Sequence, residues 1–141
     1  MLRHNTQKAF TLIEIMIVIM IIASLAAIVV PRLSGRSDQA KVSIAEADIN
    51  SNISLALKLY QLDNGNYPAS DQGLDALLVK PSSNPVPANW KEPYLEKKPL
   101  DPWGNQYQYK SPGARNTSTY DLWSLGKDGS DGTADDIKNW Q

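Results

Sequence analysis

Four aspartates and three glycines lie close together near the end of the chain, in the stretch 125–136. Carboxylate oxygens are the hard ligands that Ca²⁺ takes, and glycines give a loop the backbone freedom to wrap around an ion. The spacing differs from that of an EF-hand, because Thr133 stands where that loop requires a glycine. The residues therefore leave two interpretations open, a calcium-type site or an acidic turn without a ligand.

A further acidic residue, Glu14, stands in an apolar run in which seventeen of the nineteen residues from Leu12 to Val30 are apolar. Such an acid costs a few kcal/mol inside a membrane unless it is paired, neutralised or able to reach the interface. Glu14 lies near the start of the run, so it either reaches the headgroups or meets a cation. The best candidate cation is an α-amino group made by cutting before Phe10, in the same chain or in a neighbouring copy.

The composition excludes several classes of function. The chain has 141 residues without cysteine, and His4 is its one histidine, so cysteine chemistry, histidine triads and multi-histidine metal sites are ruled out. The net charge of −1 gives no indication of nucleic-acid binding. Adjacent carboxylates such as Asp135 and Asp136 are better placed to hold an ion than to flank a substrate bond, so we expect no enzyme.

The apolar run is long enough to cross a membrane as a helix, and we assign residues 10–31 to a transmembrane segment. A cleaved secretory signal is the rival, because Arg3 and Lys8 give a basic start. The run is longer than the apolar part of such a signal, and it passes through Pro31 into more helix. The two basic residues favour a cytoplasmic start.

An amphipathic helix is predicted over residues 32–63, with a kink or loosening near Pro31. One stripe at helical spacing should pack on the body of the protein, and a second apolar cluster occupies a different face. That second cluster indicates either a helix embedded in its own domain or a surface that contacts neighbouring subunits. The stripe consists of Val42, Ala45, Ile49, Ile53, Ala56 and Tyr60, and the cluster of Ile44, Leu55, Leu59 and Leu62.

Residues 64–141 form the predicted globular region. A short helix is expected from Gln72 to Val79, and then a proline-rich connection held down by Trp90 and Tyr94. Two strands, Gln106–Lys110 and Tyr120–Leu125, are expected to pair in antiparallel fashion, and the sequence allows a third near Ile137–Trp140. The predicted fold is α+β, a long N-terminal helix packed on a small antiparallel sheet.

The residues from Lys8 to Glu14, followed by the apolar run, resemble the class III leader of type IV pilins and pseudopilins. The resemblance implies a type IV pilin-like fold and a prepilin peptidase that cuts between Ala9 and Phe10 and methylates the new amine. Residues 1–9 are then lost, and Glu14 becomes the fifth mature residue and serves assembly. The family nearly always has glycine where this chain has Ala9, and we expect cleavage to survive because alanine is the closest steric substitute.

Three further motifs narrow the resemblance to the general secretion pathway protein G family, the major pseudopilins of type II secretion. They are Tyr67-Pro68, the run Asp101–Asn105 and the run Tyr120–Gly126. The resemblance implies a structural subunit that polymerises through its N-terminal helix into a homopolymeric filament and drives export of folded proteins. It also implies a single-pass inner-membrane protein with a periplasmic body, working with minor pseudopilins, an inner-membrane platform and a cytoplasmic ATPase. An adhesive pilin or a membrane-tethered calcium-dependent binding protein is the alternative.

In this family the loop equivalent to 125–136 binds structural calcium, so the resemblance favours the calcium interpretation. Position by position, it implies three carboxylate ligands, two backbone carbonyls and a further ligand position. Asp131 has no implied role, and we expect it to be a solvated charge. The implied ligands are Asp128, Asp135 and Asp136 through their carboxylates, Leu125 and Thr133 through their carbonyls, and Ser130.

Overall fold

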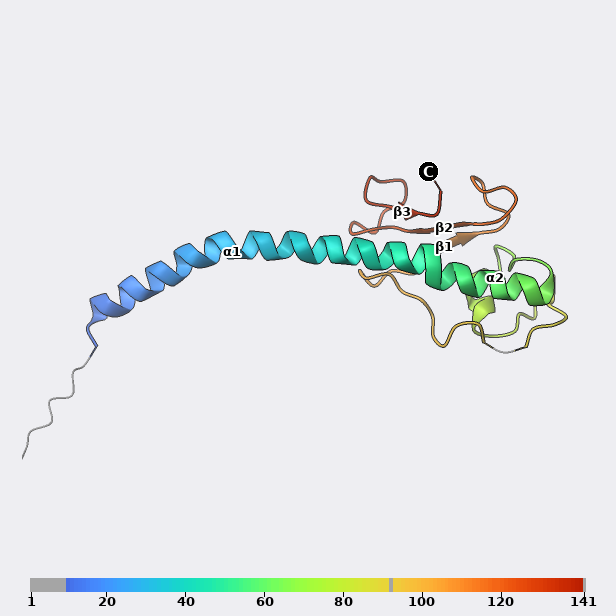
Figure 1. The fold of residues 1–141 in the computed structure, drawn as a ribbon, viewed down its shortest axis with the longest axis horizontal. Helices are drawn as coiled ribbons and strands as arrows, with labels where there is room; N and C mark the ends of the chain where they lie inside the picture. The colour runs from blue at the N-terminus through green and yellow to red at the C-terminus, as the bar shows by residue number, and fades with distance from the viewer. Residues whose placement is uncertain (1–9, 92, 141) are drawn as a thin grey trace, which may run out of the picture. The chain divides into compact units, whose positions relative to one another are not determined.

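In this computed structural model the helices, up to η2, come first along the chain, and a small sheet follows them (Figure 1). The structure describes residues 10–91 and 93–140, apart from the side chains of 29–34. The predicted leader, residues 1–9, lies outside this part. The elements are α1 (Leu12–Ala47), the π-helical turn η1 (Asp48–Asn52), α2 (Ile53–Asn64), the 3₁₀ helix η2 (Gly73–Leu77), β1 (Gln108–Lys110), β2 (Asp121–Ser124) and β3 (Ile137–Lys138).

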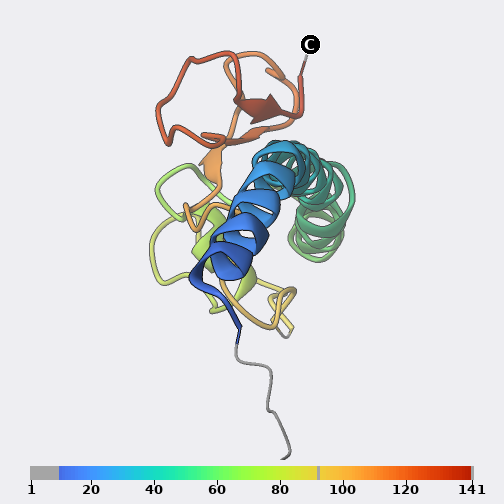
Figure 2. The same ribbon diagram turned by 90° about the vertical axis from the view of Figure 1, so that its left-hand side faces the viewer.

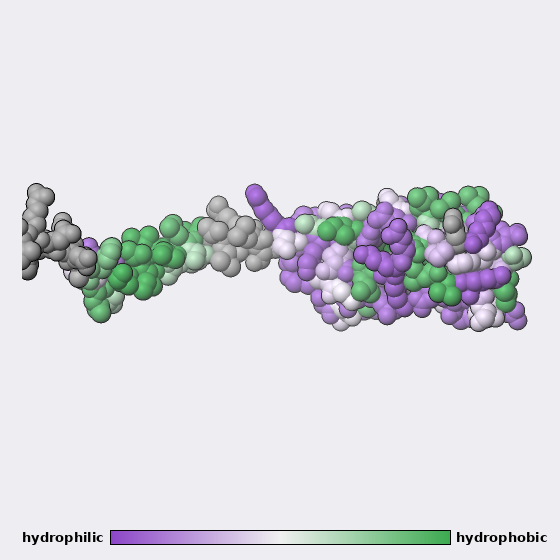
Figure 3. Space-filling model, turned by 90° about the horizontal axis from the view of Figure 1, so that it is seen from below, coloured by the Kyte–Doolittle hydropathy of each residue, from purple (hydrophilic) through white to green (hydrophobic). Residues whose placement is uncertain are grey.

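The chain divides into two compact units, the first ending at Asp38 and the second beginning at Gln39. In the first unit the large apolar side chains of α1 are exposed from Leu12 to Ile28, and they form a continuous hydrophobic surface (Figure 3). Phe10, just before the helix, is 81% exposed. Judged on the described residues, none of the helices is both long and apolar enough to cross a membrane.

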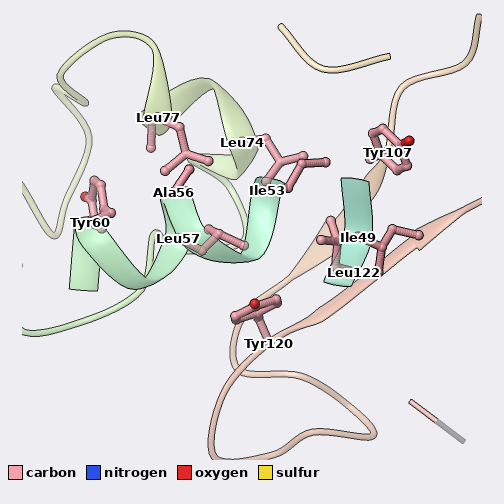
Figure 4. Packing of buried hydrophobic residues seen from close by; sticks show 11 residues of the cluster. Ile49, Ile53, Ala56, Leu57, Tyr60, Leu74, Leu77, Tyr107, Tyr120 and Leu122 are labelled. Carbon is pink, nitrogen blue, oxygen red and sulfur yellow. The ribbon is translucent and has the colours of Figure 1, made fainter. Parts of the chain in front are cut away.

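The core of the second unit is built on one face of the helical segment (Figure 4). Five residues of the predicted stripe are buried, namely Ala45, Ile49, Ile53, Ala56 and Tyr60, while Val42 at its start is half-buried. The stripe therefore packs on the body as predicted. Because these residues recur at helical spacing, they present one continuous face to the elements beside them. The side chains that meet this face are Leu74, Ala76 and Leu77 around η2 and Tyr107, Tyr120 and Leu122 from the sheet region.

The second apolar cluster on the helix is exposed. Ile44, Leu55, Leu59 and Leu62 are between 44% and 80% exposed. Of the two interpretations left open by the sequence, the structure therefore gives the surface rather than the embedded helix.

A π-helical turn interrupts the helix where the sequence predicted a regular one. The Ser54 hydroxyl donates to the Ile49 carbonyl at 2.6 Å, a bond that spans five residues. Two tyrosines from the other half of the chain bind at this place. Tyr107 Oη donates to Asp48 Oδ2, the first residue of the turn, at 2.9 Å, and Tyr120 Oη donates to Ser54 Oγ, just after the turn, at 2.8 Å. A π-helical turn holds one more residue than an α-helical turn. Here it is stabilised by side chains that are far away in sequence, so the helical periodicity of the sequence does not predict it.

The sheet is antiparallel with the order β1-β2-β3, which confirms the predicted strand pair and the short third strand. Gln108 pairs with Trp123, and Trp123 pairs with Lys138 on its other side. The sheet lies on one side of the helical segment of the second unit, and η2 lies on another (Figure 2). This is the predicted α+β arrangement.

Two aromatic residues hold the proline-rich connection against the body, as predicted. Trp90 Nε1 donates to the Ala76 carbonyl at 3.0 Å, and Tyr94 Oη donates to Asp63 Oδ2 at 3.0 Å. The helix expected from Gln72 to Val79 is shorter, a 3₁₀ helix over Gly73–Leu77.

The turn before β2 is organised by a buried carboxylate. Asp121 is 3% exposed, and its two oxygens accept from the backbone N–H groups of Ala114, Arg115 and Asn116 at 2.7–2.9 Å. Burial raises the pKa of Asp121, but these donors and the Lys110 charge lower it by more, so the pKa of this carboxyl lies below its usual range. The ionised form is therefore part of the fold.

We expect Asp121→Asn to lower the free energy of unfolding by about 1–3 kcal/mol at neutral pH, because an amide cannot accept from all three donors. The native pKa is depressed, so the charge stabilises the fold above about pH 4, the ordinary aspartate pKa, and this contribution disappears as the pH falls through the native pKa. Urea unfolding of wild type and variant at several pH values measures this, with exposed Asp71→Asn as the control. A difference between wild type and variant that did not shrink in acid would contradict the prediction.

Candidate functional site

The acidic loop 125–136 connects β2 to β3, so both of its ends are fixed by the sheet. Its three glycines, Gly126, Gly129 and Gly132, all have positive φ angles. At Gly126 a side chain would also meet Asp135, whose Oδ2 atom lies 2.6 Å from the position of a Cβ and whose carbonyl oxygen is closer still. The sequence thus folds here into a tight loop that brings Asp135 back against its first glycine.

Three carboxylates of the loop converge on one hydroxyl group. Thr133 Oγ1 lies 2.7 Å from Asp135 Oδ1, 3.3 Å from Asp128 Oδ1 and 3.4 Å from Asp136 Oδ1. The Ser130 carbonyl oxygen is 3.1 Å from the same atom. A hydroxyl carries one proton and can donate to only one of these oxygens at a time. The cluster is therefore rich in oxygen acceptors and short of positive charge.

Backbone donors and one lysine compensate part of this negative charge. Asp135 Oδ2 accepts from the N–H groups of Lys127 at 2.7 Å and Asp128 at 3.0 Å. The Thr133 hydroxyl and these backbone donors lower the pKa of Asp135. The Asp136 side chain has no exposed surface, and its Oδ2 pairs with Lys138 Nζ at 3.1 Å. Sequence reasoning did not foresee this partner, which β3 places beside the loop.

The structure brings the three predicted carboxylate ligands, Asp128, Asp135 and Asp136, together around the Thr133 hydroxyl, whereas Thr133 was predicted to contribute its carbonyl. Ser130 joins them through its carbonyl oxygen. Leu125 is half-buried at the start of the loop, directly after β2. Over the residues that the structure describes, no group of three or more His, Cys, Asp or Glu side chains is arranged to hold a metal ion.

Asp131 is exposed, as expected for a solvated charge, but it also has a hydrogen-bond partner. Trp123 on β2 donates its indole N–H to Asp131 Oδ1 at 2.9 Å, and the Trp123 ring packs edge-on against Trp140. The contact ties the outer part of the loop to the sheet. The sequence gives no sign of it, because it depends on how the loop returns over β2.

At the other end of the chain, Glu14 forms a capping box with Thr11. Thr11 donates to Glu14 Oε2 through its backbone N–H at 2.9 Å and through its hydroxyl at 3.0 Å, and the Glu14 N–H points back to Thr11 Oγ1 at 3.3 Å. The sequence carries the signal for this motif, a threonine three residues before a glutamate at the start of an apolar run. This cap is a third role for Glu14, besides the headgroup contact and the cationic partner that the apolar run predicts.

Comparisons with known proteins identify two regions of the chain. Residues 32–140 match the family model of "Type II secretion system (T2SS), protein G". Residues 4–30 match the prokaryotic N-terminal methylation motif. The two matches together cover nearly the whole sequence, and the second includes Ala9, Phe10 and Glu14.

Individual proteins from several bacteria are similar along their whole length. Type II secretion system core protein G of Pseudomonas aeruginosa is 52% identical over 99% of this chain and 99% of its own. That of Escherichia coli K12 is 47% identical, over 96% of this chain and 92% of its own. The crystal structure of the major pseudopilin from the type 2 secretion system of enterohaemorrhagic Escherichia coli has a TM-score of 0.69 and 39% identity, covering 77% of this chain and 89% of that one.

The close approach of Gly126 to Asp135 allows a matched test of the loop. Gly126→Ala and Gly132→Ala both place a side chain at positive φ, but only the first meets other atoms, since nothing lies within 4 Å of Gly132. We expect Gly126→Ala to lower the free energy of unfolding by about 1–3 kcal/mol more than Gly132→Ala, because of the added steric overlap. Urea unfolding measures both. Equal effects of the two substitutions would mean that the loop is not packed in this way.

Proposed function

This chain belongs to the type II secretion system protein G family, and from that membership we propose that it assembles through its N-terminal helix into a periplasmic pseudopilus that drives export of folded proteins. The observation that carries the proposal is the exposed apolar surface of α1 in the first unit. So large an apolar surface is not stable in water, and it requires a lipid or protein environment. The membrane would supply a lipid environment before assembly, and the filament would supply a protein environment after it.

The comparisons confirm the family that the sequence motifs indicated. The protein is a structural pseudopilin subunit and not an enzyme, since the family is one of structural secretion components. The likeness to the solved pseudopilin bears out the pilin-like α+β fold.

We place the subunit before assembly in the bacterial inner membrane, as a single-pass protein whose body faces the periplasm. The apolar segment 10–31 would be its anchor, and the basic residues Arg3 and Lys8 would remain on the cytoplasmic side. Minor pseudopilins and an inner-membrane platform are the partners that such assembly needs. These assignments rest on the methylation motif and on the apolar sequence.

Processing by a prepilin peptidase between Ala9 and Phe10 would create the charge that Glu14 needs. The new amine would belong to Phe10, next in sequence to Thr11, whose backbone N–H already donates to Glu14 Oε2. The capping box thus holds the carboxylate at the first turn, close to the predicted terminus. In the apolar interior of a filament, an unpaired carboxylate would be strongly destabilising, so we infer that pairing with this amine, within or between subunits, directs assembly.

Glu14→Gln separates charge from capping, because glutamine can still accept in the capping box but cannot pair ionically. We expect this variant to lose pseudopilus formation and protein export, measured by electron microscopy and by secretion assays in a strain that lacks the wild-type gene. Thr11→Ala is the matched control. It weakens the cap and keeps the charge, so it should retain most of the export. Normal export by Glu14→Gln, or equal loss in both variants, would contradict the charge-pairing role.

We propose calcium as the ligand of the acidic loop. What supports the proposal is the supply of oxygen donors: Asp128, Asp135 and Asp136 each have an oxygen within 3.4 Å of Thr133 Oγ1, and Ca²⁺ takes six to eight oxygens, carbonyls beside carboxylates. The Leu125 and Thr133 carbonyls and Ser130 would complete the set. The side chains would need to close around the ion in place of the hydroxyl. When bound, calcium supplies positive charge and rigidity, and no catalytic step.

We expect calcium to raise the melting temperature of the full chain in detergent micelles by about 10 °C at a hundredfold excess over its Kd, because the ion binds only the ordered loop. EGTA should reverse the shift and make the loop sensitive to protease. Asp128→Asn and Asp136→Asn should abolish the shift. Asp131→Asn is the control, because asparagine can still accept from Trp123 and the residue is not a proposed ligand. An unchanged melting temperature and protease pattern with calcium would refute the assignment.

A further inference from the structure

The Asp101–Asn105 run folds into a tight turn closed by its own first residue. The Asp101 N–H donates to the Asn105 carbonyl at 2.8 Å, and Asp101 Oδ1 accepts from the N–H groups of Trp103 at 3.0 Å and Asn105 at 2.8 Å. Asp101 is 4% exposed. One oxygen of this buried carboxylate is thus occupied by the turn itself. The proposed function assigns no role to residues Asp101–Asn105.

The second oxygen of Asp101 points to the strand that leads into the acidic loop. Ser124, the last residue of β2, is completely buried and donates its hydroxyl to Asp101 Oδ2 at 2.6 Å. The same hydroxyl accepts from the Gly126 N–H at 3.1 Å. Because a hydroxyl can donate one bond while it accepts another, these contacts form a directed chain from Gly126 through Ser124 to Asp101.

Gly126 is also where the loop closes on itself. Its Cα side faces Asp135 so closely that no side chain fits, and Asp135 Oδ2 accepts from the next two backbone N–H groups, those of Lys127 and Asp128. The position of Gly126 therefore determines the position of the backbone N–H groups that bind Asp135. The turn meets the loop at a second point, where the Asn105 side chain lies 3.7 Å from the position of a Cβ on Gly129.

We propose that Asp101 is a positioning residue of the acidic loop, which acts through Ser124 and Gly126 to set the affinity of the loop for calcium. The inference rests on the proposed calcium site. Groups that orient metal ligands without touching the ion commonly change metal affinity by about 10–100-fold, and the Asp101–Ser124 relay stands in that relation to Asp135. Without the relay, calcium would have to order the start of the loop itself, at a cost in conformational entropy.

The test compares the calcium Kd of the full chain in detergent micelles, measured by calorimetric titration with calcium chloride, among wild type, Asp101→Asn and Ser124→Ala. Asparagine preserves size and one acceptor but cannot accept the Ser124 proton at its amide nitrogen. We expect each variant to raise the Kd by about 10–100-fold. Asp121→Asn is the matched control, because it removes an equally buried turn-holding carboxylate at the other end of β2 and should leave the Kd within about threefold of wild type.

A double variant distinguishes a relay from general weakening of the fold. If Asp101 acts through Ser124, Asp101→Asn combined with Ser124→Ala should raise the Kd no further than either change alone, whereas independent effects would multiply. Hydrogen exchange of the Gly126 amide in EGTA gives a readout without the ion. It should accelerate at least tenfold in Ser124→Ala and stay unchanged in Asp121→Asn.

The outcomes separate the two proposals. If wild type does not bind calcium, the proposed site is wrong and this inference falls with it. If wild type binds and both relay variants keep its Kd, the site stands and the positioning role is overturned. A Kd raised equally in Asp121→Asn, or effects that multiply in the double variant, would also overturn the relay. Should Asp101→Asn fail to fold, the Kd and Gly126 exchange of Ser124→Ala decide alone.

Discussion

The second unit depends on one face of its helical segment, because its sheet is too small to bury a core alone. The strands hold two to four residues each, and so short a sheet requires a packing partner. Ile49, Ile53 and Leu57 supply that partner, and they are fully or almost fully buried. The same face packs against η2 as well as against the sheet region, so a single stripe organises both halves of the body.

The loops of the body are ordered by buried polar groups rather than by regular structure. Asp121 holds the turn before β2, and Ser124 with Asp101 holds the start of the loop after it. Both devices work because a buried carboxylate or hydroxyl must be hydrogen-bonded, and backbone N–H groups of a turn are the donors within reach. A strand of four residues thereby controls the geometry of two long connections.

The first unit follows the opposite rule, because its apolar side chains have no core to enter. Those of α1 from Leu12 to Ile28 remain exposed. In the second unit, the helical residues Ile44, Leu55, Leu59 and Leu62 are exposed as well. Such exposed apolar surface is typical of an interaction site, and it fits a structural subunit whose apolar side chains become covered by membrane or by neighbouring subunits. Under the proposed function, these exposed surfaces are the ones that mediate assembly.

Features that depend on a local pattern can be predicted from the sequence alone. Helical spacing predicts the buried stripe from Ala45 to Tyr60, alternation predicts β1 and β2, and the Thr11–Glu14 capping box has its own sequence signature. The π-helical turn, the Trp123–Asp131 contact and the Asp101–Ser124 relay could be found only in the folded chain, since each joins residues with no common local pattern. The Asp101–Ser124 contact forms because packing brings the two polar groups into a buried place where they must hydrogen-bond to each other, whereas the Trp123–Asp131 contact is exposed.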